Sequence, residues 1–123
     1  MNVKEIAFVC YPTTSLKRAQ AFYKGILGLK ETSNWTQNDA SGMIEYDIGT
    51  STLAIGAGAP NFKPGKSGPT AALEVADFKA AVKKLKDKKV KFLMEPMDTP
   101  VCHMALVEDP DGNQIMIHQR KPK

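Results

Sequence analysis

Residues 106–119, with the sequence LVEDPDGNQIMIHQ, restrict the fold more than any other part of the chain. They predict a β-hairpin, because one apolar-rich run enters a corner at residues 109–113 and a second run leaves it. Pro110 presets φ at the second position of the turn, and Gly112 supplies a positive φ at low steric cost. Met116 and His118 are two residues apart on the outgoing strand, so they share one face of it.

The length and composition predict one globular domain over residues 1–123. The chain is 42% hydrophobic and carries a formal net charge of +4, and this length is enough to bury a core. Seven lysines lie within residues 79–91, on one predicted helix and its exit. Without a nucleic-acid-binding motif or interleaved aromatic residues, this excess indicates a solvated helix face, so we expect no nucleic-acid partner.

The cysteines and the first residues indicate the compartment. Cys10 and Cys102 are the only cysteines. The first apolar run is interrupted by charge and is too short for a signal peptide or a membrane span. We therefore expect a cytoplasmic protein with reduced thiols and no membrane association.

The first half of the chain predicts strand, helix, then a hairpin. A short apolar strand is expected at residues 3–9, and Ser15 is placed to cap a helix whose apolar residues recur at three-and-four spacing. Gly28 is placed to end that helix. A polar loop is expected at 31–42, carrying Trp35, before strands at 43–48 and 52–55.

The second half repeats this order after a linker rich in Gly and Pro at residues 57–69. Asp77 is placed to cap the second helix, and the expected strands are residues 70–75, 90–93, 101–107 and 114–118. An offset of about 62 residues relates the two halves. The order predicts an α+β fold of two strand–helix–three-strand (βαβββ) modules, at about 1–56 and 70–123.

Three motifs resemble one superfamily. They are the terminal DPDGN hairpin, the helix end FYKGILGL at residues 22–29, and ALEV at residues 72–75. Together and in register they resemble the vicinal-oxygen-chelate superfamily of glyoxalases, bleomycin-resistance proteins and extradiol dioxygenases. The resemblance implies that the strands of the two modules form a curled mixed sheet with a cup for a ligand, commonly in a homodimer.

The resemblance also implies positions for a metal site. Metal-using members commonly place histidine where this chain has Phe8 or Ala7, and again where it has Thr70 or Ala71. They place glutamate where it has Met116. Phenylalanine has no lone pair, and a Met sulfur suits copper(I) better than zinc or iron. We therefore expect the usual metal triad to be absent and predict no cofactor.

Glu45 and His118 remain as candidate catalytic residues and as candidate ligands of a displaced divalent-metal site, together with Glu74. The alternative for His118 is a strand-end histidine that only hydrogen-bonds its surroundings. His103 follows Cys102, but neighbours on a strand point to opposite faces, which argues against a Cys–His catalytic dyad.

The favoured function is binding of a small organic molecule in the cup without metal. Trp35 and Tyr46 are candidates to stack on a planar ligand, with ordinary core packing as the alternative. The candidate ligand-binding residues are Phe8, Trp35, Tyr46, Thr70, His103, Met116 and His118. One alternative is a lactoylglutathione-lyase-like or dioxygenase-like metalloenzyme with a displaced site. Another is a regulatory or interaction domain whose cup is filled by its own side chains.

Overall fold

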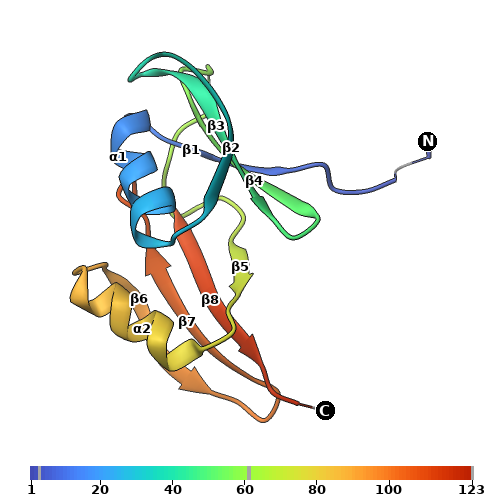
Figure 1. The fold of residues 1–123 in the computed structure, drawn as a ribbon, viewed down its shortest axis with the longest axis vertical. Coiled ribbons are helices and arrows are strands. Elements are labelled where there is room, and N and C mark those ends of the chain that lie inside the picture. Colours follow the sequence, from blue (N-terminus) through green and yellow to red (C-terminus); the bar gives the residue numbers. More distant parts are fainter. Residues whose placement is uncertain (3, 61, 123) are drawn as a thin grey trace. The chain divides into compact units, whose positions relative to one another are not determined.

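The computed structural model describes residues 1–2, 4–60 and 62–122 and divides the chain into two compact units, Met1–Pro64 and Gly65–Lys123. Each unit contains one four-stranded sheet with a helical segment on one face (Figure 1). The boundary between the units falls within residues 57–69, where the sequence predicts a linker. No helix in the described part of the chain is long and apolar enough to span a membrane.

The sheet of the first unit has the order β1-β4-β3-β2, with β1 parallel to β4 and the other neighbours antiparallel. Its strands are β1 (Val9–Pro12), β2 (Lys30–Asn38), β3 (Ser41–Ile48) and β4 (Ser51–Ala57). The predicted hairpin between β3 and β4 is confirmed, and Gly49 at its tight turn has a φ of 59°.

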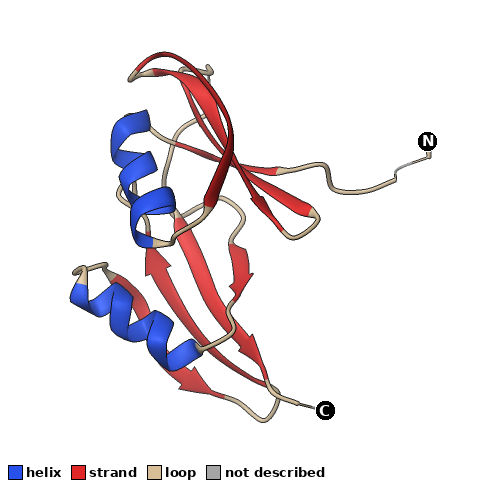
Figure 2. Cartoon of the chain, in the orientation of Figure 1, coloured by secondary structure: helices blue, strands red, loops and turns tan. Residues whose placement is uncertain are grey.

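Two predictions about this sheet are wrong. The strand predicted at residues 3–9, of which residue 3 lies outside the described residues, starts only at Val9, where pairing with β4 begins. The segment predicted as a loop at 31–42 is mostly strand β2 (Figure 2). Because β2 is an edge strand with nearly all of its side chains exposed, its sequence lacks the alternation that marks a half-buried strand.

The helical segment of the first unit begins and ends as predicted. Helix α1 spans Leu16–Gln20 and continues as a π-helical segment, η1, over Ala21–Ile26. The Ser15 hydroxyl accepts a hydrogen bond from the main-chain N–H of Arg18 at 3.3 Å, which satisfies one free donor of the first turn. Gly28 follows with a φ of 71°, a conformation in which glycine is favoured after a helix.

The core of the first unit lies between this helical segment and the sheet. The rings of Tyr23 and Tyr46 stack with centroids 6.1 Å apart, and Phe22 meets Tyr23 edge to face at 5.1 Å. Ile44 and Ile55, neighbours on β3 and β4, are buried on the same side of the sheet. These contacts fix which face of the sheet is covered by its helix.

The sheet of the second unit has the order β5-β8-β7-β6. Its elements are β5 (Ala71–Glu74), α2 (Phe78–Asp87), β6 (Phe92–Asp98), β7 (Cys102–Glu108) and β8 (Gln114–Arg120). All five are predicted by the sequence, with boundaries shifted by a few residues. Asp77 caps α2 as predicted, because its Oδ1 accepts the main-chain N–H of Ala80 at 3.0 Å.

The corner between β7 and β8 is built around Asp109. This buried carboxylate accepts the main-chain N–H groups of Asp111 at 2.9 Å and Asn113 at 2.8 Å. Gly112 takes the positive φ, 87°, that the sequence assigns to it. The hairpin at residues 106–119 is therefore confirmed, and its corner is held by side-chain as well as main-chain hydrogen bonds.

The two sheets are related by the predicted duplication. The pairs that join β1 to β4 match the pairs that join β5 to β8 residue for residue. The shift from Val9 to Ala71 is 62 residues, and so is the shift from Leu53 to Ile115. The same shift applies to the other three pairs, which confirms the repeat.

Candidate functional site

The candidate site of the first unit lies on the sheet face opposite its helix. Alternation along β3 puts Ile44 and Tyr46 on the helix side, which leaves Met43 and Glu45 on the opposite side. Cross-strand pairing adds Trp35, which faces Met43 from the neighbouring strand β2.

A pocket of about 390 Å³ is formed at this face. We call it the aromatic pocket, because its walls include three exposed aromatic side chains: Phe8 at 48%, Trp35 at 68% and Phe62 at 36%. Met43 and Cys10 also line the pocket. Large exposed apolar side chains that gather at one concavity are typical of a ligand site rather than of scattered surface residues.

Glycine keeps the floor of this pocket open. A Cβ at Gly56 would lie 3.3 Å from the Cys10 sulfur and 3.6 Å from the Phe62 ring. A side chain there would therefore occupy space between two walls of the pocket. Gly56 pairs with Met43 across β3 and β4, which places it on the same face.

Glu45 and Cys10 are the chemically reactive groups of this face. Burial, reinforced by the negative charge of Glu45, raises the pKa of the Cys10 thiol to about 11. The thiol is therefore almost entirely protonated at neutral pH and is a poor nucleophile there. The carboxylate of Glu45 forms no hydrogen bond or ion pair with any other described residue.

Tyr46, a predicted ligand-stacking residue, lies elsewhere. It is fully buried on the helix side of the sheet, where its ring stacks on Tyr23. Burial, with a smaller contribution from the charge of Glu31, raises the pKa of its hydroxyl to about 12. This position fits the alternative interpretation of Tyr46 as a core residue. It does not fit the prediction that Tyr46 contacts a ligand.

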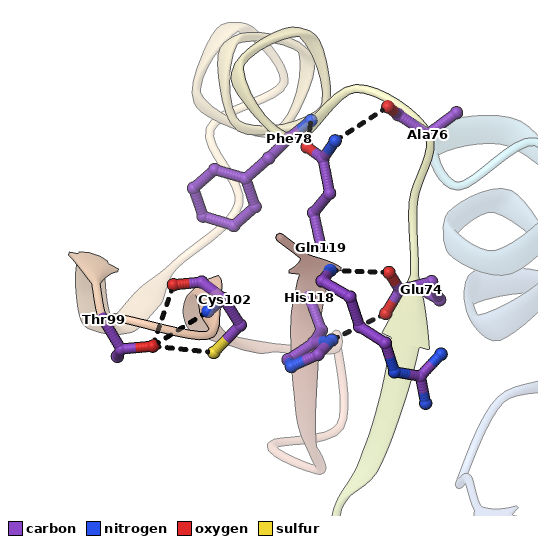
Figure 3. A network of polar contacts seen from close by, with 8 residues as sticks. Glu74, Ala76, Phe78, Thr99, Cys102, His118 and Gln119 are labelled. Carbon is purple, nitrogen blue, oxygen red and sulfur yellow. Dashed lines mark hydrogen bonds and ion pairs between the residues drawn. The ribbon is translucent and has the colours of Figure 1, made fainter. Parts of the chain in front are cut away.

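The second unit carries a polar network around His118 (Figure 3). The Nδ1 atom of His118 lies 2.6 Å from Oε1 of Glu74, and the other oxygen of Glu74 accepts the main-chain N–H of Arg120 at 2.7 Å. The hydrogen bond from Arg120 and then that from His118 lower the pKa of Glu74. The carboxylate therefore stays ionised and holds the imidazole in one orientation.

His103 lies on the other face of the same sheet. It pairs with Gln119 across β7 and β8, and its ring stacks on Phe78 of α2 with centroids 5.6 Å apart. Met116 and His118 alternate with Ile117 and point away from α2. The sheet therefore separates His103 from Met116 and His118, which contradicts the prediction that all three line one cup.

Cys102 does not form a catalytic pair with His103. Its sulfur lies 3.2 Å from the Thr99 hydroxyl (Figure 3). Alternation along β7 puts it on the face opposite to His103. Both cysteines are free thiols.

The positions that correspond to a metal triad hold side chains unsuited to zinc, iron or manganese. Phe8 precedes β1 and lines the aromatic pocket. Thr70 precedes β5 and shares a hydrogen bond of 3.5 Å with Gln114. Met116 offers only a thioether. Within the described part of the chain, no three His, Cys, Asp or Glu residues are grouped to hold a metal ion.

Two features of these sites are missed by the sequence. Phe62 lies in the predicted linker, where no periodicity marks it as a pocket residue. The hydrogen bond from Arg120 to Glu74 uses the main chain, which no residue pattern reveals. Glu74, the partner of His118, is among the residues that the sequence groups with it, and the register of β5 against β8 brings the two together.

Comparison with known proteins identifies the family. The model of the Glyoxalase/Bleomycin resistance protein/Dioxygenase superfamily matches residues 5–117. No curated protein sequence matches the chain.

Several solved structures have the same fold. TnmS3, an antibiotic binding protein from Streptomyces sp. CB03234, is 21% identical with a TM-score of 0.81, covering 98% of this chain and 99% of that one. A glyoxalase/bleomycin resistance protein from the same organism is 22% identical with a TM-score of 0.77, covering 94% and 100%. The fosfomycin resistance protein FosX from Listeria monocytogenes is 12% identical with a TM-score of 0.76, covering 96% and 94%. The chain belongs to the Glyoxalase/Bleomycin resistance protein/Dioxygenase superfamily.

Proposed function

We propose that the chain binds a small, flat organic molecule in the aromatic pocket of its first unit and does not transform it. The observation that carries this proposal is the convergence of Phe8, Trp35 and Phe62 on one pocket of about 390 Å³. Burying these exposed rings against a ligand removes apolar surface from water, worth roughly 25 cal/mol per Å². Offset stacking of aromatic rings adds to that gain.

The pocket walls favour a ligand without negative charge. Among the described residues no Lys or Arg lines the pocket and none pairs with the carboxylate of Glu45, which is close enough to raise the pKa of Cys10 in the pocket wall. One structural relative is described as an antibiotic binding protein, and another as a resistance protein. Sequestration of a drug-like molecule is consistent with these relatives.

We propose further that the protein works without metal, as a homodimer in the cytoplasm. The side chains at Phe8, Thr70 and Met116 support the absence of the usual metal triad. Light scattering coupled to size-exclusion chromatography measures the oligomeric state, and a monomeric mass would contradict the homodimer.

Trp35 provides a direct test, because it is the only tryptophan in the chain. Its fluorescence is measured during titration with flat aromatic compounds, including catechols, glutathione thioesters and glycopeptide antibiotics. We expect a compound that binds to change Trp35 fluorescence saturably and to raise the melting temperature.

Paired variants then locate the binding site. Phe62→Ala is expected to weaken binding about tenfold or more, since aromatic truncations at the centre of a site are costly. Val9→Ala removes a similarly exposed apolar side chain, 39% against 36% for Phe62, that does not line this pocket, and it is expected to change nothing. Equal effects of both variants, or no binding by any compound in the set, would contradict the proposal.

A metalloenzyme resembling lactoylglutathione lyase or a dioxygenase is the second candidate. It is favoured only by the Glu74–His118 contact, because a metal-bound histidine commonly donates its other ring N–H to a carboxylate. Glu45 and His118 are the two candidate metal ligands, fewer than the three that a catalytic zinc site uses. Elemental analysis before and after addition of nickel, zinc or iron(II) tests it, and stoichiometric metal lost in His118→Ala would favour the enzyme.

A further inference from the structure

A second pocket, of about 450 Å³, lies in the second unit on the side of His118. It is lined by the connection between β6 and β7 and by the end of β8. Its lining includes His118, Arg120 and Lys121. The rest of its lining includes Pro100 and Val101, so a basic group of side chains adjoins an apolar wall.

The imidazole of His118 is held with one nitrogen available. Glu74 contacts Nδ1, so the Nε2 atom is the one left to meet a ligand. In Figure 3 the ring of His118 lies between Glu74 on one side and Cys102 on the other. Since only 21% of the His118 side chain is exposed, the ring is fixed by its surroundings rather than free in solvent.

The guanidinium of Arg120 is available for a ligand as well. The contact between Arg120 and Glu74 uses the main-chain N–H, and the side chain forms no ion pair or hydrogen bond with any other described residue. A guanidinium presents several N–H donors in one plane and suits an oxyanion held by two hydrogen bonds.

Lys121 lines the pocket, but its ammonium group is paired with Asp98, which also contacts His103 on the other face of the sheet. Its Nζ lies 2.5 Å from Oδ1 of Asp98, and 31% of its side chain is exposed. The main chain of Lys121 also donates to the carbonyl of Val101 at 2.9 Å, which ties the end of β8 to the apolar wall. This main-chain hydrogen bond holds the two sides of the pocket together.

We propose that this second pocket binds a small organic oxyanion, a carboxylate or phosphate group on a compact apolar body. The Arg120 guanidinium binds the anionic group, with the Nε2 side of His118 beside it. The apolar body lies against Pro100 and Val101. The site is distinct from the aromatic pocket of the first unit and does not depend on the function proposed for it.

Nuclear magnetic resonance of the two histidines tests the proposal on the intact chain. The chain has only two histidines, and they lie on opposite faces of one sheet, so His103 is an internal control. Benzoate and phenyl phosphate are titrated at fixed pH and ionic strength, with benzyl alcohol as the uncharged probe. The Cε1–H signals are assigned from the His103→Gln and His118→Gln variants.

We expect either anion, or both, to move the His118 signal saturably while the His103 signal stays in place, and benzyl alcohol to move neither. Benzoate alone would assign the site to carboxylates, and phenyl phosphate alone to phosphate esters. Arg120→Gln is expected to raise the dissociation constant about tenfold, the scale of one charge-assisted contact. This variant keeps the main-chain bond to Glu74, so it leaves the His118 network in place.

Lys84→Gln is the matched control, because it removes the same charge from an exposed position on α2 outside the pocket. It is expected to leave the dissociation constant unchanged. An unmoved His118 signal, equal movement of both histidines, or equal effects of Arg120→Gln and Lys84→Gln would overturn the proposal. Trp35 fluorescence reports the aromatic pocket separately, so failure of one site is distinguishable from failure of the other.

Discussion

One oxygen of the Glu74 carboxylate lies 2.6 Å from the imidazole of His118, and the other oxygen accepts the main-chain N–H of Arg120. Glu74 and His118 are also direct partners in the parallel pairing of β5 with β8. The histidine nearest to the family's metal position is therefore engaged by an ionised carboxylate. Its orientation is set by the Glu74 carboxylate, which strand pairing brings beside it.

Glu74→Gln tests the electrostatic part of this arrangement. The pKa of Glu74 is lowered by its hydrogen bonds, so its contribution to stability is present above the ordinary value of 4.5 and is lost as pH falls through the folded-state pKa. We expect the wild type to exceed the variant in stability at pH 7 and the difference to shrink below about pH 4.5. Urea unfolding at a series of pH values measures this, and a difference independent of pH would contradict it.

Tyr46→Phe removes a buried hydroxyl that has no hydrogen-bond partner among the described residues. Because a buried unsatisfied polar group costs free energy, we expect the variant to be more stable, by about 1 kcal/mol. Urea denaturation gives the free energy of unfolding. A clear loss of stability would show that the hydroxyl has a partner, such as a buried water.

Two glycine substitutions are expected to have opposite effects. Gly25 lies in η1, and a Cβ there would meet nothing within 4 Å, so Gly25→Ala should stabilise the fold by roughly 0.5–1 kcal/mol. At Gly42, with a φ of 147°, a Cβ would lie 2.5 Å from the carbonyl oxygen of Trp35. Gly42→Ala should cost about 2 kcal/mol or more. Thermal unfolding compares the two, and similar melting temperatures would contradict the expected difference.

Cys10 should react slowly with iodoacetamide at pH 8, since its pKa is about 11 and the thiolate is the reactive form. Glu45→Gln removes the charge that contributes to this shift and should accelerate alkylation several-fold. Asp47→Asn, on the same strand, is the control. Mass spectrometry of the Cys10 peptide gives the rates, and equal acceleration in both variants would exclude a specific effect of Glu45.

Elements with a clear apolar period could be predicted from the sequence, and elements defined by their partners could not. Ser15 and Asp77 cap their helices as expected, because a cap depends on a side chain and the N–H groups that follow it. The sequence does not indicate strand β2, because an exposed edge strand buries neither face and shows no apolar alternation. The start of β1 was misplaced because pairing with β4 decides it.

The site residues too could be predicted only in part. Alternation along β8 correctly puts Met116 and His118 on one face. It does not show which face α2 covers, so His103 was placed on the wrong side of the sheet. Tyr46 was one residue away from the pocket face, and a shift of one residue along a strand exchanges the two faces.

His118 and Gln119 are neighbours in sequence but serve separate compartments of the second unit. His118 contributes to the basic pocket, whereas the Gln119 side chain accepts the first N–H of α2 at 2.8 Å and donates to the Ala76 carbonyl. The strand therefore separates the two functions. One residue anchors the helix, and its neighbour in sequence contributes to the pocket on the other face. Mutation can therefore change what the pocket accepts without loosening the helix behind it.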